Sequence, residues 1–149
     1  MILSTFILAQ AFFQIVCCAA GPYNVAAVKQ VMVKNAAASW ELGTASEALL
    51  ELDNTDLSVF GHHAFTSASA ETEALAYAKP HIALGSDLLI ADAASNSDPA
   101  SLGVAAVMLG KKISAYSTAA ENQLNTLLYH TPKASNGAIS HRSRSIALW

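Results

Sequence analysis

The sequence predicts an all-α fold. Apolar residues recur at spacings of three and four in five segments between residues 24 and 131, which is the period of an amphipathic helix. Residues that begin helices precede four of these segments, and glycine or proline ends three of them. The starting residues are Asn24, Ser39, Asp98 and Ser114, and the ending residues are Pro80, Gly110 and Pro132.

The composition bounds the class of protein. At 149 residues the chain has room for one domain. Hydrophobic residues make up 53% of it and charged residues 13%, which leaves little polar surface for a free-standing globule and indicates a fragment of a larger fold. The formal charge of -3 and the lack of a basic block in the sequence argue against a nucleic-acid partner.

Residues 1–20 are expected to be a signal peptide. Their apolar run closes with the small residues Cys18 and Ala20, so we expect cleavage after Ala20, a secreted, extracellular protein and no membrane contact after cleavage. No Lys or Arg precedes the run, and the alternative is an amphipathic or buried helix. Because Cys17 and Cys18 both fall in this leader, the mature chain would hold no disulfide and no cysteine metal site.

The first two helices follow the leader as a hairpin. Asn24 is expected to cap a helix that runs to about Ala38, with an apolar stripe of Val25, Val28, Val31 and Met32. Ser39 is expected to cap the second helix, which the polar run 53–56 ends. The buried stripe of this second helix is predicted as Leu42, Ala45, Leu49 and Leu52.

The start of the second helix is the strongest candidate for a binding surface. Trp40 offers an aromatic plate and Glu41 a carboxylate, while Gly43 and Thr44 keep the first turns thin. Together they are able to form the wall of a sugar pocket. The alternative is that Trp40 is a buried anchor and Glu41 an ordinary first-turn acid that favours the positive end of the helix dipole.

Three further helices are predicted. Glu71 and Glu73 open the third, and Pro80 ends it near Lys79. Its shared apolar face is Ala74, Leu75, Ala78 and Ile82. Asp98 is expected to cap the fourth, with proline at its first position, and the fourth helix presents Leu102, Ala105, Ala106 and Leu109. Ser114 is expected to cap the fifth, whose apolar face is Tyr116, Ala119, Ala120, Leu124, Leu127 and Leu128.

The helices alternate in character. The second and fourth are apolar and rich in small residues, as inner helices are, while the others carry the charged and amide side chains of an outer layer. The adjacent His62 and His63 lie in a predicted polar loop without a third nearby ligand, so no metal site is expected there.

Three segments of the chain resemble the fungal branch of the six-hairpin glycosidases. They read SWELGTASEALLE from Ser39, DPASLG from Asp98 and SNGAISHR from Ser135. The resemblance is to the group around glycoside hydrolase family 105, the unsaturated rhamnogalacturonyl hydrolases, with family 88 as a near relative. It extends from about Val25 to Trp149.

The resemblance implies a partial (α/α)6 toroid, with about two and a half of six helical hairpins in residues 21–149. It implies a substrate too: an oligosaccharide with a terminal unsaturated uronic acid, as pectin fragments carry. Such enzymes hydrate the C4–C5 double bond of that sugar with an Asp as general acid and base, rather than by the usual two-carboxylate displacement, and no cofactor is implied.

The resemblance also implies roles for single residues. Trp40 and Glu41 match an aromatic and acid pair, and His141 and Arg142 match a His and basic pair that touches the substrate. The alternative for the second pair is an exposed polar loop end. Asp98 is a candidate catalytic residue, with Asp92 as the other local acid, although a cap is a sufficient role for Asp98.

The family's general acid is expected just after Trp149, so we expect an N-terminal fragment of the hydrolase without activity of its own. The alternative function is a short secreted helical protein that binds a partner without catalysis. A toroid enzyme that acts on other uronates is a third interpretation.

Overall fold

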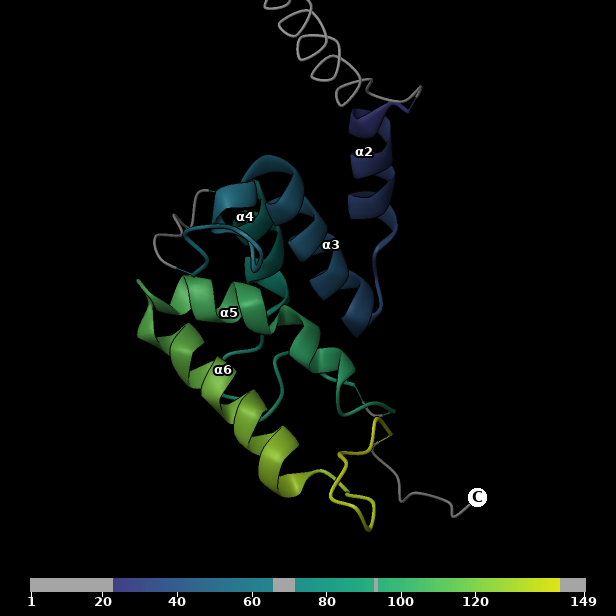
Figure 1. Ribbon diagram of the computed structural model, residues 1–149, viewed down its shortest axis with the longest axis vertical. Coiled ribbons are helices and arrows are strands. Elements are labelled where there is room, and N and C mark those ends of the chain that lie inside the picture. The colour runs from purple at the N-terminus through teal and green to yellow at the C-terminus, as the bar shows by residue number, and fades with distance from the viewer. Residues whose placement is uncertain (1–22, 66–71, 93, 143–149) are drawn as a thin grey trace, which may run out of the picture. The chain divides into compact units, whose positions relative to one another are not determined.

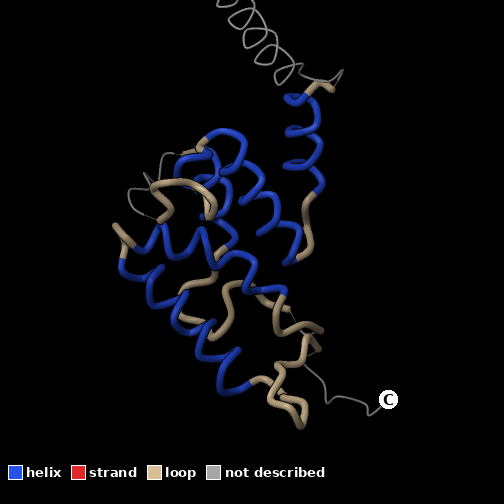
Figure 2. The backbone as a smooth tube through the Cα atoms, viewed as in Figure 1, coloured by secondary structure: helices blue, strands red, loops and turns tan. Residues whose placement is uncertain are grey.

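The computed structural model describes residues 23–65, 72–92 and 94–142. The described residues form helices and loops and contain no strand, which confirms the all-α prediction (Figures 1 and 2). The helices are α2 (Val25–Asn35), α3 (Ser39–Asp53), α4 (Glu73–Ala78), α5 (Gly103–Gly110) and α6 (Ser114–Asn125). Short 3-10 turns are η2 (Thr55–Leu57), η3 (Lys79–His81) and η4 (Asp98–Leu102), and a π-helical turn, η5 (Thr126–His130), follows α6.

The chain divides into two compact units, one ending at Val31 and the other beginning at Met32. In the first unit, Asn24 Oδ1 accepts a hydrogen bond of 3.0 Å from the Ala27 N–H, which confirms the predicted cap of α2. The expected signal peptide lies outside the described residues. Among the helices that are described, none has both the length and the apolar character of a membrane span.

Helix α3 is the central element of the second unit. It packs against α4, η4 and α5. Leu42, Ala45 and Leu49 are buried as predicted, but Leu52 is 49% exposed. The prediction for Leu52 is wrong because the buried stripe takes two residues from each turn, and in the last full turn these are Leu49 and Leu50.

Ser39 does not cap α3 as predicted. Ala38 occupies the cap position, and the carboxylate of Glu41 accepts hydrogen bonds of 2.9 Å from the N–H groups of Ala37 and Ala38. These bonds fix the start of the helix from within its own segment. The Ser39 hydroxyl is therefore available for a partner from elsewhere in the chain.

The predicted apolar faces of the third and fourth helices are confirmed, since all eight residues are buried. Helix α4 ends at Ala78, and Pro80 lies in the 3-10 turn that follows. Asp98 is not a cap, because Ser97 precedes the helical turns and Asp98 is the first residue of η4. The backbone N–H of Asp98 donates to the Ser95 hydroxyl at 3.1 Å.

The fifth helix departs from its prediction in its second half. Ile113, rather than Ser114, occupies the cap position, and Tyr116 and Ala119 are buried as expected. Leu124 and Leu128 are exposed. One reason is that Gln123 takes the buried position, and the π turn at 126–130 then changes the helical register.

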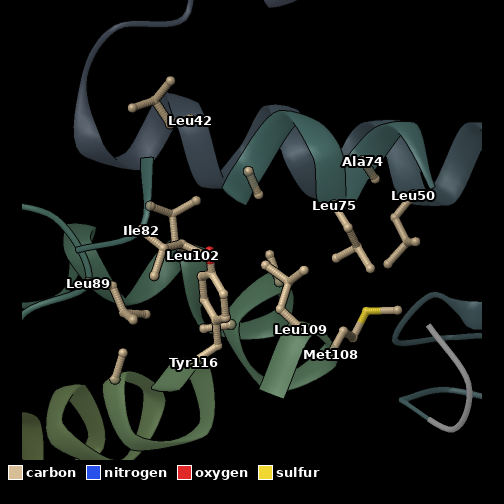
Figure 3. Packing of buried hydrophobic residues seen from close by; sticks show 14 of the residues in the cluster. Leu42, Leu50, Ala74, Leu75, Ile82, Leu89, Leu102, Met108, Leu109 and Tyr116 are labelled. Carbon is tan, nitrogen blue, oxygen red and sulfur yellow. The ribbon is translucent and has the colours of Figure 1, made fainter. Parts of the chain in front are cut away.

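The core lies between α3, α4, α5 and α6. Figure 3 shows Leu50, Leu75, Met108 and Leu109 pointing toward one another, with the Tyr116 ring beside them. The cluster of buried residues is Leu42, Leu49, Leu50, Ala74, Leu75, Ala78, Ile82, Leu89, Leu102, Ala105, Ala106, Met108, Leu109, Tyr116 and Ala119. Met32 and Val33 pack against it from the edge. Burial of this apolar surface is the main stabilising contribution to the second unit.

Gly43 allows η4 to approach α3 at backbone distance. A Cβ atom built on Gly43 would overlap the side chain and the backbone of Ser101, whereas one built on Gly103 meets nothing within 4 Å. The close approach brings the Ser101 hydroxyl to the carbonyl oxygen of Ser39 at 3.1 Å. Any side chain at position 43 must separate the two elements.

We predict that Gly43→Ala destabilises the protein by about 1–3 kcal/mol because of this overlap, although alanine favours helices. The matched control is Gly103→Ala, which introduces the same methyl group into open space and is expected to stabilise by roughly 0.4–1 kcal/mol. Urea unfolding followed by circular dichroism measures both. Equal effects of the two substitutions would contradict the close contact.

Truncation to alanine is predicted to cost much more stability at one leucine of α3 than at another. Leu49 is fully buried, so Leu49→Ala is expected to cost about 2–5 kcal/mol of unfolding free energy. Leu52→Ala, the same change at a half-exposed site, is expected to cost about 0.5 kcal/mol or less. Thermal and urea unfolding report both values, and a larger cost at Leu52 would refute the assigned face.

Candidate functional site

Polar residues from three distant parts of the second unit meet at the start of α3. We call this group the polar cluster: Ser39, Asp92, Asn96, Ser97, Asp98 and His141. Ser39 lies in the first turn of α3, Asp92 to Asp98 precede and begin η4, and His141 comes from the segment that follows η5. The cluster therefore joins residues that are separated by 44 to 53 positions along the chain.

Asp92 makes the most connections in the cluster. Its Oδ2 accepts a 2.5 Å hydrogen bond from the Ser39 hydroxyl, and its Oδ1 accepts from the N–H groups of Ala94 and Ser95 at 2.9 and 3.1 Å. The Ser39 hydroxyl, then the Ala94 N–H, then Ser95 and the nearby His141 lower the pKa of Asp92, against a smaller opposing effect of burial. The carboxylate is therefore held in its charged form.

Residues 131–142 form a segment that we call the strap. Hydrogen bonds within the strap fold it back on itself, and others hold it against the polar cluster. Lys133 and Ile139 form one isolated bridge, and Ser95 and Arg142 form another. Asn96 holds the end of the strap, since its backbone N–H donates to the carbonyl oxygen of His141 at 2.8 Å and its side chain donates to that of Arg142 at 2.6 Å. The strap is thus anchored mainly by its backbone, which leaves side chains such as Lys133, His141 and Arg142 exposed.

His141 lies between two side chains of the segment that begins η4. Its Nδ1 is hydrogen-bonded to the Ser97 hydroxyl and lies 3.7 Å from Asp98 Oδ1. Both neighbours face the same ring nitrogen, so this is not the arrangement of a nucleophilic triad, in which serine and aspartate contact opposite nitrogens. Protonated His141 gains an ion pair with Asp98.

The structure brings the candidate residues of the sequence together only in part. Asp98 and His141 are neighbours, and Arg142 is exposed beside them on the strap. Trp40 is 50% exposed, which excludes a buried anchor, and it follows Ser39 directly. Glu41 turns its carboxylate to the backbone of Ala37 and Ala38, whose N–H groups lower its pKa.

Asn96 and Ser97 have no prediction of their own in the sequence, and Asp92 is named there only as a local acid. Asn96 and Ser97 hold the strap, and Asp92 links it to α3. The one local signal was the spacing of Asp92 and Ser95, because an aspartate commonly accepts a hydrogen bond from an N–H two or three residues later. Its bond to Ser39, 53 residues away, has no local signal.

The charged side chains of the polar cluster are not arranged as a metal site. Within the part of the chain that the structure describes, no group of three or more His, Cys, Asp or Glu side chains is placed to hold an ion. His63 Nδ1 instead lies 2.5 Å from Asp56 Oδ2 as an exposed pair.

Comparisons with known proteins add no relative. No family model matches the chain, and neither a curated protein nor a solved structure is significantly similar to it.

The lowered pKa of Asp92 predicts a loss of stability in acid. A carboxyl group whose pKa is lower in the folded than in the unfolded protein stabilises the fold at pH values above the unfolded value of about 3.9, and that contribution is lost as the pH falls through the folded pKa. Asp92→Asn is therefore expected to lower Tm at pH 7, and the difference from wild type is expected to shrink below about pH 4.

Asp87→Asn is the matched control, because it removes one negative charge from an exposed position. Thermal unfolding between pH 2.5 and 7 measures both variants. A Tm difference for Asp92→Asn that stays constant over this range would show that the charge of Asp92 does not stabilise the fold.

Proposed function

We propose that this chain supplies part of the sugar-binding wall of a secreted six-hairpin glycoside hydrolase that acts on oligosaccharides with a terminal unsaturated uronic acid. One observation supports the proposal above the others. Of the three segments that resemble the family, the one that begins at Asp98 contacts both others. The Ser101 hydroxyl donates to the carbonyl oxygen of Ser39, and Asp98 Oδ1 lies 3.7 Å from His141 Nδ1.

The proposal includes a partial (α/α)6 toroid. Helix α3 contacts α4 and α5, and α5 contacts α4 and α6 (Figure 1). Contacts between consecutive helices, and between the inner helices α3 and α5, are what such a toroid requires. Ser39 and Trp40 are then at the open end of an inner helix.

The side chains at this end suit a uronate. The exposed Trp40 offers an apolar face to a sugar ring. Arg142 is exposed, and the structure gives its guanidinium no partner among the described residues, so it is available to pair with a carboxylate. His141 and Asp98 offer hydrogen-bond partners beside it.

We assign binding, rather than proton transfer, to these residues. Asp92 accepts three hydrogen bonds and is held charged, which makes it unsuited to donate a proton. Hydration of the C4–C5 double bond needs a general acid, and we assign that role to none of these residues.

A second candidate function is a helical protein that binds a partner without catalysis. The observation that favours it is the exposed apolar side chains of the last helical turns, Leu124, Leu128 and Tyr129. These side chains offer apolar contact area to a partner.

We predict that the purified chain binds an unsaturated uronyl disaccharide and releases no product from it. Arg142→Gln is expected to weaken binding roughly tenfold, because it removes a charge-assisted hydrogen bond to the uronate carboxylate. Isothermal titration and NMR titration measure the affinity, and loss of the ultraviolet absorbance of the C4–C5 double bond would reveal turnover.

Lys133→Gln is the matched control, since it removes one positive charge from the same strap. It is expected to leave the affinity nearly unchanged. Failure of the wild-type chain to bind the disaccharide, or equal losses in the two variants, would refute a uronate site at Arg142, and the second candidate function would then be preferred.

A further inference from the structure

The backbone that carries Trp40 is held on several sides. The side chain of the preceding Ser39 is bonded to Asp92, and the Ser39 carbonyl oxygen accepts from the Ser101 hydroxyl at 3.1 Å. The Trp40 carbonyl oxygen accepts from the Thr44 hydroxyl at 2.8 Å. Ser39 is only 7% exposed, whereas the next side chain, Trp40, is half exposed. A fixed backbone therefore presents an accessible indole.

Asp92 connects this backbone to the strap. One of its oxygens holds Ser39, and the other holds the N–H groups of the turn that begins with Ala94 and Ser95. Ser95 and the following Asn96 bond to the strap at the His141 and Arg142 carbonyl oxygens. The described contacts thus form a continuous path from Trp40 to Arg142.

We propose that Asp92 is a positioning residue, which through Ser39 holds the Trp40 indole at a fixed place relative to the strap that carries His141 and Arg142. The sugar ligand of Trp40 and Arg142 rests on the proposed function, whereas the positioning of Trp40 by Asp92 does not. Removal of the Asp92 carboxylate or of the Ser39 hydroxyl breaks the bond between them and lets the first turn of α3 move relative to the strap. The indole then loses its fixed orientation, and a sugar that contacts both Trp40 and Arg142 binds less tightly.

Trp40 fluorescence tests the positioning role directly. The background variant is Trp149→Phe, which leaves Trp40 as the single tryptophan. In this background, Ser39→Ala and Asp92→Ala are each expected to lower the fluorescence anisotropy of Trp40 and to raise its quenching by acrylamide. The double variant is expected to change no more than either single variant, because the two residues act through one bond.

Conservative substitution separates positioning from general loss of structure. Ser39→Thr keeps the hydroxyl and is expected to restore the anisotropy and quenching of the background protein. Far-UV circular dichroism of each variant identifies any that is unfolded, and Ser39→Ala, the smaller change, decides the question if Asp92→Ala does not fold. The control is Ser117→Ala, which removes a hydroxyl from α6.

The outcomes distinguish this proposal from the function that it extends. Unchanged Trp40 anisotropy in folded Ser39→Ala, or no restoration by Ser39→Thr, overturns the positioning role even if the disaccharide binds. Changed anisotropy with no binding by the wild-type chain supports the positioning role and refutes the uronate ligand. Support for both requires changed anisotropy together with an affinity for the disaccharide that falls roughly tenfold in Ser39→Ala.

Discussion

The close approach of η4 to α3 is the constraint on which the rest of the second unit depends. Gly43 has no side chain where Ser101 packs, so the two backbones lie closer than ordinary helical contacts allow. Leu102 of η4 is buried in the same core cluster as Leu42 of α3, and Asp92, which precedes η4, bonds to Ser39 at the start of α3. The apolar packing and the polar cluster are therefore two results of one contact.

The polar cluster satisfies backbone groups before it offers anything to a ligand. Asp92 and Asn96 each bond to main-chain atoms that helices and strands would otherwise pair, as Glu41 does outside the cluster. In a loop-rich site such bonds fix backbone segments that no helix or strand holds. What is left for a ligand is the half-exposed Trp40 and the side chains of the strap, which is a surface of few groups on a well-fixed frame.

The sequence predicted the apolar faces well and the polar contacts poorly. Periodicity identified the buried residues of α4 and α5, because burial repeats with the helical turn. It misplaced Leu52 and Leu124, whose burial depends on which neighbour packs there and on the π turn after α6. Ser39 and Asp98 look like caps from their local sequence, yet tertiary contacts with Asp92 and His141 determine their roles. The motif segments indicated where the candidate site lies, but not that Asp92 connects its parts.

The anchoring of the strap has a consequence for the order of folding. Its contacts with Ser95, Asn96 and Ser97 join residues 44 to 46 positions apart, and α5 and α6 lie between them. Closing so long a loop costs less conformational entropy once the intervening helices have packed against each other. The strap is therefore expected to form late and to open first in native-state hydrogen exchange, with the helical core still intact.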